Sequence, residues 1–140
     1  MSTRDYPDRP IVGVGAVIVR DRHVLLVRRN SEPRRGDWSL PGGVLELGET
    51  LRHGVEREVR EETGLQVRVE QVLEVFDSII PDASGRTQFH YVLIDFLCVA
   101  IAGELRAGSD VAEAVWARVD DLEKFKLTKN ALLAIEKAVG

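Results

Sequence analysis

The 140-residue sequence is short of cysteine, of excess positive charge and of long apolar runs, and each shortage excludes a class of protein. The single cysteine, Cys98, cannot form an internal disulfide. The longest apolar stretch, residues 96–102, is far shorter than the roughly 20 residues that span a bilayer. A net charge of -4 provides no broad basic surface for a nucleic-acid polymer. We therefore expect a cytoplasmic protein with neither a membrane nor a nucleic acid as its partner.

The remaining composition is that of a globular domain. Hydrophobic residues make up 44% of the chain and charged residues 30%, and the length fits one domain with a substantial core. Residues 1–10 are polar, contain two prolines and lack the apolar core of a secretory signal. We therefore predict a flexible tail at 1–10 and a single domain at 11–140.

The apolar pattern predicts interleaved strands and helices. Strands are expected over residues 11–19, 24–29, 67–80, 89–100 and 114–119, and helices near 50–64 and 128–139. The two longest strands are joined by a turn-rich segment, so they should form a hairpin. This order of elements indicates an α/β layered domain.

Three carboxylates in the first helix carry the clearest chemical signal. Glu58, Glu61 and Glu62 stand at positions i, i+3 and i+4, which places them on one narrow arc of a helix. Like charges this close repel one another unless a cation joins them. Clusters of carboxylate oxygens suit hard divalent ions, so the pattern predicts a site for Mg²⁺, with Mn²⁺ as a substitute.

The segment that contains these carboxylates resembles the Nudix box, GX5EX7REUXEEXGU, where U is a bulky aliphatic residue. Every specified position matches, from Gly43 through Glu49 and the Arg57-Glu58-Val59 run to Glu61, Glu62, Gly64 and Leu65. The resemblance implies the α/β/α sandwich with a mixed β-sheet of that family. It also implies metal-dependent hydrolysis of the pyrophosphate bond in a nucleoside diphosphate linked to another moiety.

The same resemblance assigns roles inside the box. Glu58, Glu61 and Glu62 would be metal ligands, Gly43 would place a backbone carbonyl near the metal, and Arg57 would orient the carboxylates. Glu49 is either a partner of this group or a favourable charge at the helix N-terminus. Gly54 is expected to face the carboxylate arc, and the alternative is close packing against a neighbour.

Substrate contacts are expected from several segments outside the helix. Arg29 at the end of the second strand would bind phosphate while Arg28 faces away, and His90 would lie near the substrate. Glu46 faces either solvent or the substrate. Pro81 stands sixteen residues after the box, a spacing that resembles ADP-ribose pyrophosphatases, although an ordinary turn residue explains it equally well.

The general base has three candidates. Glu61 is one, but tight metal coordination would reduce its basicity. In proteins that the chain resembles, an acid from the loop corresponding to residues 103–110 swings to the metal. Asp110 or Glu113 would then serve as base or auxiliary ligand, with Glu113 favoured for its longer reach. The alternative is that both are solvent-exposed loop acids.

These inferences predict a Nudix pyrophosphohydrolase whose substrate is a small nucleotide. The favoured substrate is ADP-ribose, which would yield AMP and ribose 5-phosphate. One alternative is a nucleoside triphosphate, oxidised forms included, and another is a non-catalytic Nudix-like nucleotide sensor. The family resemblance also leads us to expect a homodimer.

Overall fold

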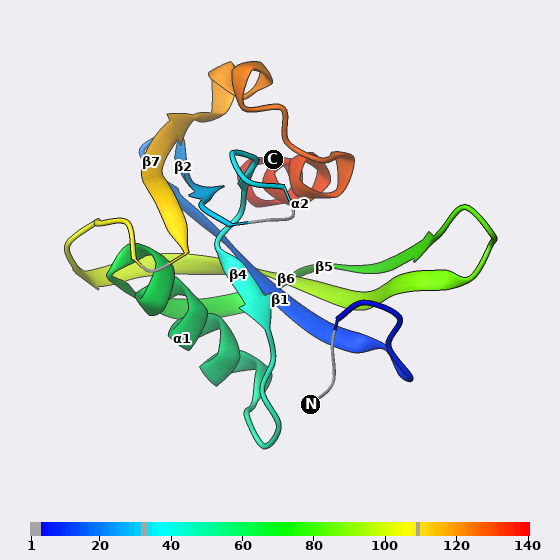
Figure 1. The fold of residues 1–140 in the computed structure, drawn as a ribbon. Coiled ribbons are helices and arrows are strands. Elements are labelled where there is room, and N and C mark those ends of the chain that lie inside the picture. Colours follow the sequence, from blue (N-terminus) through cyan, green and yellow to red (C-terminus); the bar gives the residue numbers. More distant parts are fainter. Residues whose placement is uncertain (1–3, 32–33, 109) are drawn as a thin grey trace.

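The computed structural model describes residues 4–31, 34–108 and 110–140, and Figure 1 shows the arrangement of the elements. In chain order these are β1 (Ile11–Arg20), β2 (His23–Arg29), β3 (Trp38–Ser39), β4 (Gly42–Val44), α1 (Leu51–Thr63), β5 (Leu65–Pro81), β6 (Thr87–Gly103), β7 (Val111–Arg118) and α2 (Lys129–Val139). Two short 3-10 turns, Val119–Asp121 and Glu123–Phe125, precede α2.

The strands form one mixed sheet in the order β3-β2-β1-β6-β5. β1 runs parallel to β6 and antiparallel to β4, while β2 pairs with β3 and β7 and the long β5 and β6 form the predicted hairpin. Helix α1 lies on one face of the sheet and α2 on the other (Figure 1). The predicted α/β/α sandwich is therefore confirmed.

Both ends of α1 are capped where the sequence predicts. The Thr50 hydroxyl accepts a hydrogen bond from the His53 backbone N–H at 3.2 Å, and Gly64 adopts a left-handed conformation (φ 76°) that ends the helix. Val55 and Val59 are almost completely buried. Their spacing of four residues places both on one side of α1, so the helix docks there and presents other side chains to the site.

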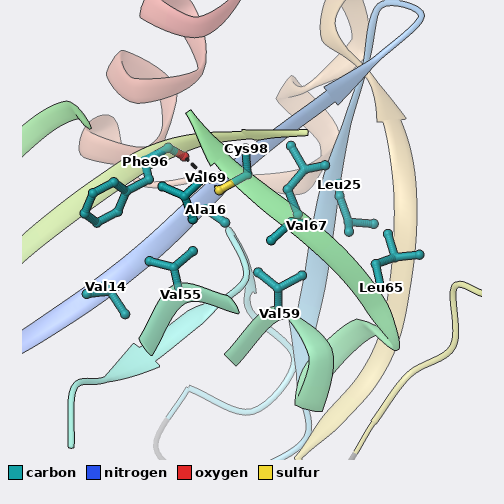
Figure 2. Packing of buried hydrophobic residues seen from close by; sticks show 11 residues of the cluster. Val14, Ala16, Leu25, Val55, Val59, Leu65, Val67, Val69, Phe96 and Cys98 are labelled. Carbon is teal, nitrogen blue, oxygen red and sulfur yellow. Dashed lines mark hydrogen bonds between the residues drawn. The ribbon is translucent and has the colours of Figure 1, made fainter. Parts of the chain in front are cut away.

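Figure 2 shows the core between α1 and the sheet, where Val55 and Val59 of the helix face apolar side chains of the strands. Cys98 belongs to this cluster and is 1% exposed. Burial raises the pKa of its thiol to about 12. Cys98 is thus an inert core residue.

A second core fills the opposite face of the sheet beneath α2. It buries Ala134 and Ile135 of the helix together with Val17 of β1. Trp38 borders this core and meets the edge of Phe125, with ring centroids 5.0 Å apart. Trp38 therefore packs against the protein.

The hairpin is longer than the strand beside it. β1 pairs with only residues 91–98 of β6, so the outer end of the β5–β6 hairpin extends beyond β1 and away from α1 (Figure 1). Pairing continues as far as Pro81 opposite Thr87. This outer end is a separate surface from the one that α1 covers.

The expected flexible tail covers residues 1–10, of which residues 1–3 lie outside the described residues. Within residues 4–10, Tyr6 contacts that outer end. The Tyr6 N–H donates to the carbonyl oxygen of Gln88 at 2.7 Å, and the Tyr6 hydroxyl donates to Asp82 at 2.6 Å. The Arg86 guanidinium stacks 4.3 Å from the centre of the Tyr6 ring. Side chains of the hairpin turn, which is remote in sequence, hold this segment in place.

Candidate active site

Arg57 is the centre of the site. Its guanidinium donates from Nη1 to Glu58 Oε1 at 2.7 Å and to Glu61 Oε1 at 3.0 Å, and from Nη2 to the carbonyl oxygen of Val44 at 3.2 Å. It also donates two hydrogen bonds to Glu49, which are the main cause of its raised pKa. The side chain is only 18% exposed, so these bonds are partly shielded from water. One arginine therefore orients two of the predicted metal ligands.

Glu49 is the fixed partner of Arg57. The hydrogen bonds from Arg57 are the main cause that lowers the Glu49 pKa to about 2, and the Glu46 backbone N–H, which donates to Oε1 at 3.0 Å, contributes further. Of the two roles weighed for Glu49, the structure supports the partner role. Glu46 itself is exposed, and its carboxylate lies 3.6 Å from Arg57 Nη1.

The two glycines of β4 contact two different carboxylates. A Cβ added to Gly43 would lie 2.5 Å from the Glu58 carboxylate, so only glycine leaves room for that group. The Gly42 N–H donates to Glu62 Oε1 at 2.9 Å. Burial raises the Glu62 pKa to about 7 despite this hydrogen bond, and the charge of Glu58 adds to the rise. β4 therefore lies beside both Glu58 and Glu62.

Arg29 faces the same side of the sheet as these carboxylates. Leu25 packs beneath α1 and Leu26 packs on the α2 side, so strand alternation turns Arg29 toward α1 and Arg28 toward α2. The positive charge of Arg29 partly opposes the rise in the Glu62 pKa, which agrees with this placement. Arg29 thus lies on the same face of the sheet as the carboxylates and close to Glu62.

Glu113 is held on the other face. It lies opposite Arg28 in the β2–β7 pair, and its Oε1 accepts a hydrogen bond from Arg28 Nη1 at 2.8 Å. Arg28 faces away from the carboxylates, so Glu113 does too. The structure does not bring Glu113 to the site, because it belongs to a paired strand and not to a free loop.

The loop before β7 is fastened to the end of α1. The backbone N–H groups of Arg106 and Gly108 donate to the carbonyl oxygens of Thr63 and Glu62, both at 2.9 Å. The Asp110 side chain is exposed, and its carbonyl oxygen accepts a hydrogen bond from the Asn30 N–H at 3.1 Å. Any swing of this loop toward the metal site would first have to break these bonds.

Pro81 and His90 lie in the outer part of the hairpin. Glu74 pairs with Asp95, Asp95 with Gly15, and Gly15 with Gly42. Glu74 therefore lies at the same position along the strands as the carboxylate site. Pro81 is seven residues further along β5, a distance of roughly 20 Å in an extended strand. The structure does not bring either residue to the carboxylates, because β5 and β6 continue beyond the end of β1.

Gly54 does not face the carboxylate arc, and our expectation on this point was wrong. A Cβ at this position would lie 2.7 Å from Leu45 Cδ1 and 3.2 Å from Glu49 Oε1. Gly54 therefore allows the loop before α1 to pack closely on the helix, which is the alternative reading. The helical wheel shows on which side of α1 Gly54 lies, but it cannot show that the loop carrying Leu45 and Glu49 covers that side.

Two contributors to the site escaped the sequence reasoning. The Gly42 N–H that binds Glu62 is a backbone group, and the Pro-Gly-Gly run at residues 41–43 was the available signal. Thr63 is completely buried, and its hydroxyl donates to the carbonyl oxygen of Val59 at 2.6 Å and accepts from the Leu65 N–H. It closes the helix directly after the carboxylates.

The residues present fit a hard divalent ion. Glu58, Glu61 and Glu62 provide carboxylate oxygens from one helix, and the glycine at 43 leaves space beside Glu58. Within the described residues no three acidic, histidine or cysteine side chains are arranged to hold a metal ion. In this arrangement Arg57 donates hydrogen bonds to Glu58 and Glu61. An ion would have to share these carboxylates with Arg57. Also within the described residues, no helix is long and apolar enough to cross a membrane.

A three-layer α/β/α domain with carboxylates on a capped helix and an arginine that orients them defines a class of phosphate-bond hydrolases. Comparisons with known proteins assign the family. Residues 9–137 match the NUDIX domain, so the chain belongs to the Nudix family and is a pyrophosphohydrolase. Hydrolases of this family generally use divalent metal ions.

Three similar proteins illustrate the range within the family. An ADP-ribose pyrophosphatase of Methanocaldococcus jannaschii is 41% identical over 89% of this chain and 71% of its own length. A nucleoside triphosphatase of Escherichia coli is 30% identical over 66% of this chain and 69% of its own length. The crystal structure of a MutT NUDIX hydrolase from Burkholderia pseudomallei has a TM-score of 0.79 and 36% identity, covering 93% of this chain and 98% of that one.

Proposed function

We propose that the protein hydrolyses ADP-ribose to AMP and ribose 5-phosphate in a Mg²⁺-dependent reaction. The observation that carries the choice of substrate is the 41% identity to an ADP-ribose pyrophosphatase over 89% of this chain. The chemistry rests on Arg57, which binds the carboxylates of Glu58 and Glu61, and on Gly42, which binds Glu62. Arg57 and the three carboxylates are specified positions of the Nudix box, and Gly42 directly precedes it.

The proposed division of labour follows from the position of each residue. Glu58, Glu61 and Glu62 would hold the metal ion, with a backbone carbonyl from Gly43 as a further oxygen. When bound, the ion would neutralise phosphate oxygens and lower the pKa of a bound water. Arg29, on the same face, would bind a phosphate of the substrate by charge-assisted hydrogen bonds.

For the general base we propose Glu61 ahead of Glu113 and Asp110. Glu61 lies on the helix face of the site and is 48% exposed, which leaves it accessible to water. Glu113 is bound to Arg28 on the opposite face of the sheet. The pH dependence of kcat at saturating Mg²⁺ tests this choice. The Glu61→Gln variant should lose the acidic limb of the profile, whereas Asp110→Asn and Glu113→Gln should keep it.

A nucleoside triphosphate is the second candidate substrate, favoured by the 30% identity to the nucleoside triphosphatase. The deciding experiment compares kcat/KM for ADP-ribose, sugar nucleotides, nucleoside triphosphates and dinucleoside polyphosphates with Mg²⁺. We expect ADP-ribose to rank first and to yield AMP and ribose 5-phosphate. A higher rank for any nucleoside triphosphate overturns this substrate. Tight nucleotide binding without turnover of any compound would instead favour a sensor.

Three further expectations belong to the proposal. Pro81 and His90 would contact the substrate from the outer hairpin, so Pro81→Ala and His90→Ala should change KM. An unchanged KM would mean that they make no such contact. The chain would act as a homodimer, which light scattering of the purified protein tests. The protein would lie in the cytoplasm, which localisation of the tagged chain tests.

A further inference from the structure

Asp95 is a mostly buried carboxyl group that the reaction described above does not use. Its neighbours in β6, Ile94 and Phe96, pack in the core beneath α1. Strand alternation therefore turns Asp95 to the opposite face of the sheet, the face on which α2 packs. Burial raises the Asp95 pKa to about 6, and the charge of Glu74 adds to the rise. The protein thus keeps an acid where water solvates it poorly.

No hydrogen-bond donor within residues 4–31, 34–108 and 110–140 contacts the Asp95 side chain. Its neighbour across the strands, Glu74, is another acid. The nearby cation Lys137 is already engaged, since its Nζ lies 2.6 Å from Glu74 Oε2 and donates to the carbonyl oxygen of Leu73. Among the described residues no side-chain oxygen is both buried and unpartnered, so the Asp95 oxygens reach the surface and are open to a donor from outside the chain.

Glycines connect Asp95 to the carboxylate site. A Cβ on Gly15 would lie 2.5 Å from Asp95 Oδ1, so the carboxyl group lies across β1 only because residue 15 has no side chain. Gly15 pairs with Gly42 of β4, and the next residue, Gly43, contacts Glu58 on the other face. Asp95 is therefore two strand spacings from β4, roughly 10 Å.

We propose that Asp95 binds a hydrogen-bond donor on the substrate outside the diphosphate, on its nucleobase or its sugar, and so helps to select the accepted substrate. This inference rests on the proposed function. β4 is three residues long and is hydrogen-bonded to β1. The proposal requires that a substrate whose diphosphate lies at Glu58 and Glu62 extends past this short strand to the Asp95 face, over roughly 10 Å. A carboxyl group repels phosphate and attracts N–H and O–H donors, which fixes the part of the substrate that it binds.

The test uses pairs of substrates that differ in one donor. ADP-ribose and IDP-ribose differ at the exocyclic amine of the base, and ADP-ribose and ADP-glucose differ in the sugar. The ratio of kcat/KM within each pair is measured for the wild type and for three variants. Asp95→Asn changes the charge and one oxygen, Gly15→Ala displaces the carboxyl group, and Asp77→Asn is the control, an exposed acid of the same hairpin.

Asp95→Asn and Gly15→Ala should both change one ratio by about tenfold or more, the usual loss for a hydrogen bond to a charged group. A change in the first ratio places the donor on the base, and a change in the second places it on the sugar. The Asp77→Asn ratios should equal those of the wild type. Folding of each variant is checked by circular dichroism. If a folded Asp95→Asn enzyme keeps both ratios within about twofold, the inference is wrong.

Failure of the proposed function gives a different result. A wild-type enzyme that cleaves none of the three compounds refutes the activity but still allows a binding test. Titration calorimetry with AMP, IMP and ribose 5-phosphate then compares the wild type with Asp95→Asn. A weaker affinity of the variant for at least one of these compounds supports the role of Asp95. Unchanged affinities for all three contradict it.

Discussion

Arg57 donates two hydrogen bonds to Glu49, from Nε to Oε2 at 2.7 Å and from Nη2 to Oε1 at 3.0 Å. The remaining guanidinium nitrogen, Nη1, is directed at Glu58 and Glu61. Glu49 therefore fixes the plane of the guanidinium, and through it the two carboxylates that are expected to bind metal. The bidentate geometry is specific to arginine, because a lysine ammonium cannot make two parallel bonds to one carboxylate.

Replacing Arg57 with Lys should lower kcat by about 10- to 100-fold while the fold is retained, as for other groups that orient metal ligands. The Mg²⁺ concentration for half-maximal activity should rise in parallel, because the carboxylates lose their orientation. Glu49→Gln should have a smaller effect in the same direction. Glu46→Gln is the control, since that side chain is exposed and 3.6 Å from Arg57. Equal losses in Glu49→Gln and Glu46→Gln would contradict the role of Glu49.

Mg²⁺ should stabilise the folded protein independently of turnover. Binding relieves the repulsion among Glu58, Glu61 and Glu62, so the thermal midpoint of the wild type should rise with Mg²⁺ concentration and return after EDTA treatment. Glu58→Gln and Glu62→Gln should abolish turnover and flatten this dependence, while their metal-free midpoints equal or exceed that of the wild type. Differential scanning fluorimetry measures all three proteins. A Glu58→Gln variant with the wild-type response would exclude Glu58 as a ligand.

Gly54→Leu should reduce activity by roughly tenfold or more through displacement of the loop that carries Glu49, a change comparable to loss of an orienting group. Leucine also raises helix propensity by close to 1 kcal/mol relative to glycine, which partly offsets the crowding against Leu45. Arg60→Leu, an exposed position on the same helix, is the matched control. Circular dichroism checks that both variants fold, and kcat measures the loss of activity. Equal activities would mean that the loop adapts to the larger side chain.

Asp95 should make stability depend on pH. The Asp95 pKa is raised to about 6 in the folded state, so the folded protein binds this proton more tightly than the unfolded chain does. Its contribution to stability is therefore greatest below the unfolded pKa near 4 and declines as pH rises to about 6. The Asp95→Asn variant has no carboxyl group to titrate, so its stability should not show this decline. The free energy of unfolding of the variant should therefore rise relative to that of the wild type as the pH increases from about 4 to about 6. Urea unfolding at several pH values measures the difference, and a constant difference would refute the assignment.

The sequence by itself determined the features whose information is local. The spacing of Glu58, Glu61 and Glu62, the cap at Thr50 and the terminating Gly64 all act within one or two helical turns, and the structure has α1 between those residues. The spacing of Val55 and Val59 likewise fixed the face that docks on the sheet. This segment belongs to the Nudix box at residues 43–65, so the family and the α/β/α sandwich could be predicted from the sequence.

Tertiary structure decided which distant groups meet these residues. Gly42 binds Glu62 because α1 packs on β4, and Arg28 binds Glu113 because β2 pairs with β7, contacts that span 20 and 85 positions of sequence. A pattern in one segment carries no information about the register of another, since a shift of one residue would turn every side chain to the opposite face. For this reason Glu113 could be expected at the site and yet lie away from it. For the same reason Asp95, an acid within an apolar strand, had no visible role until β1 and β4 were placed beside it.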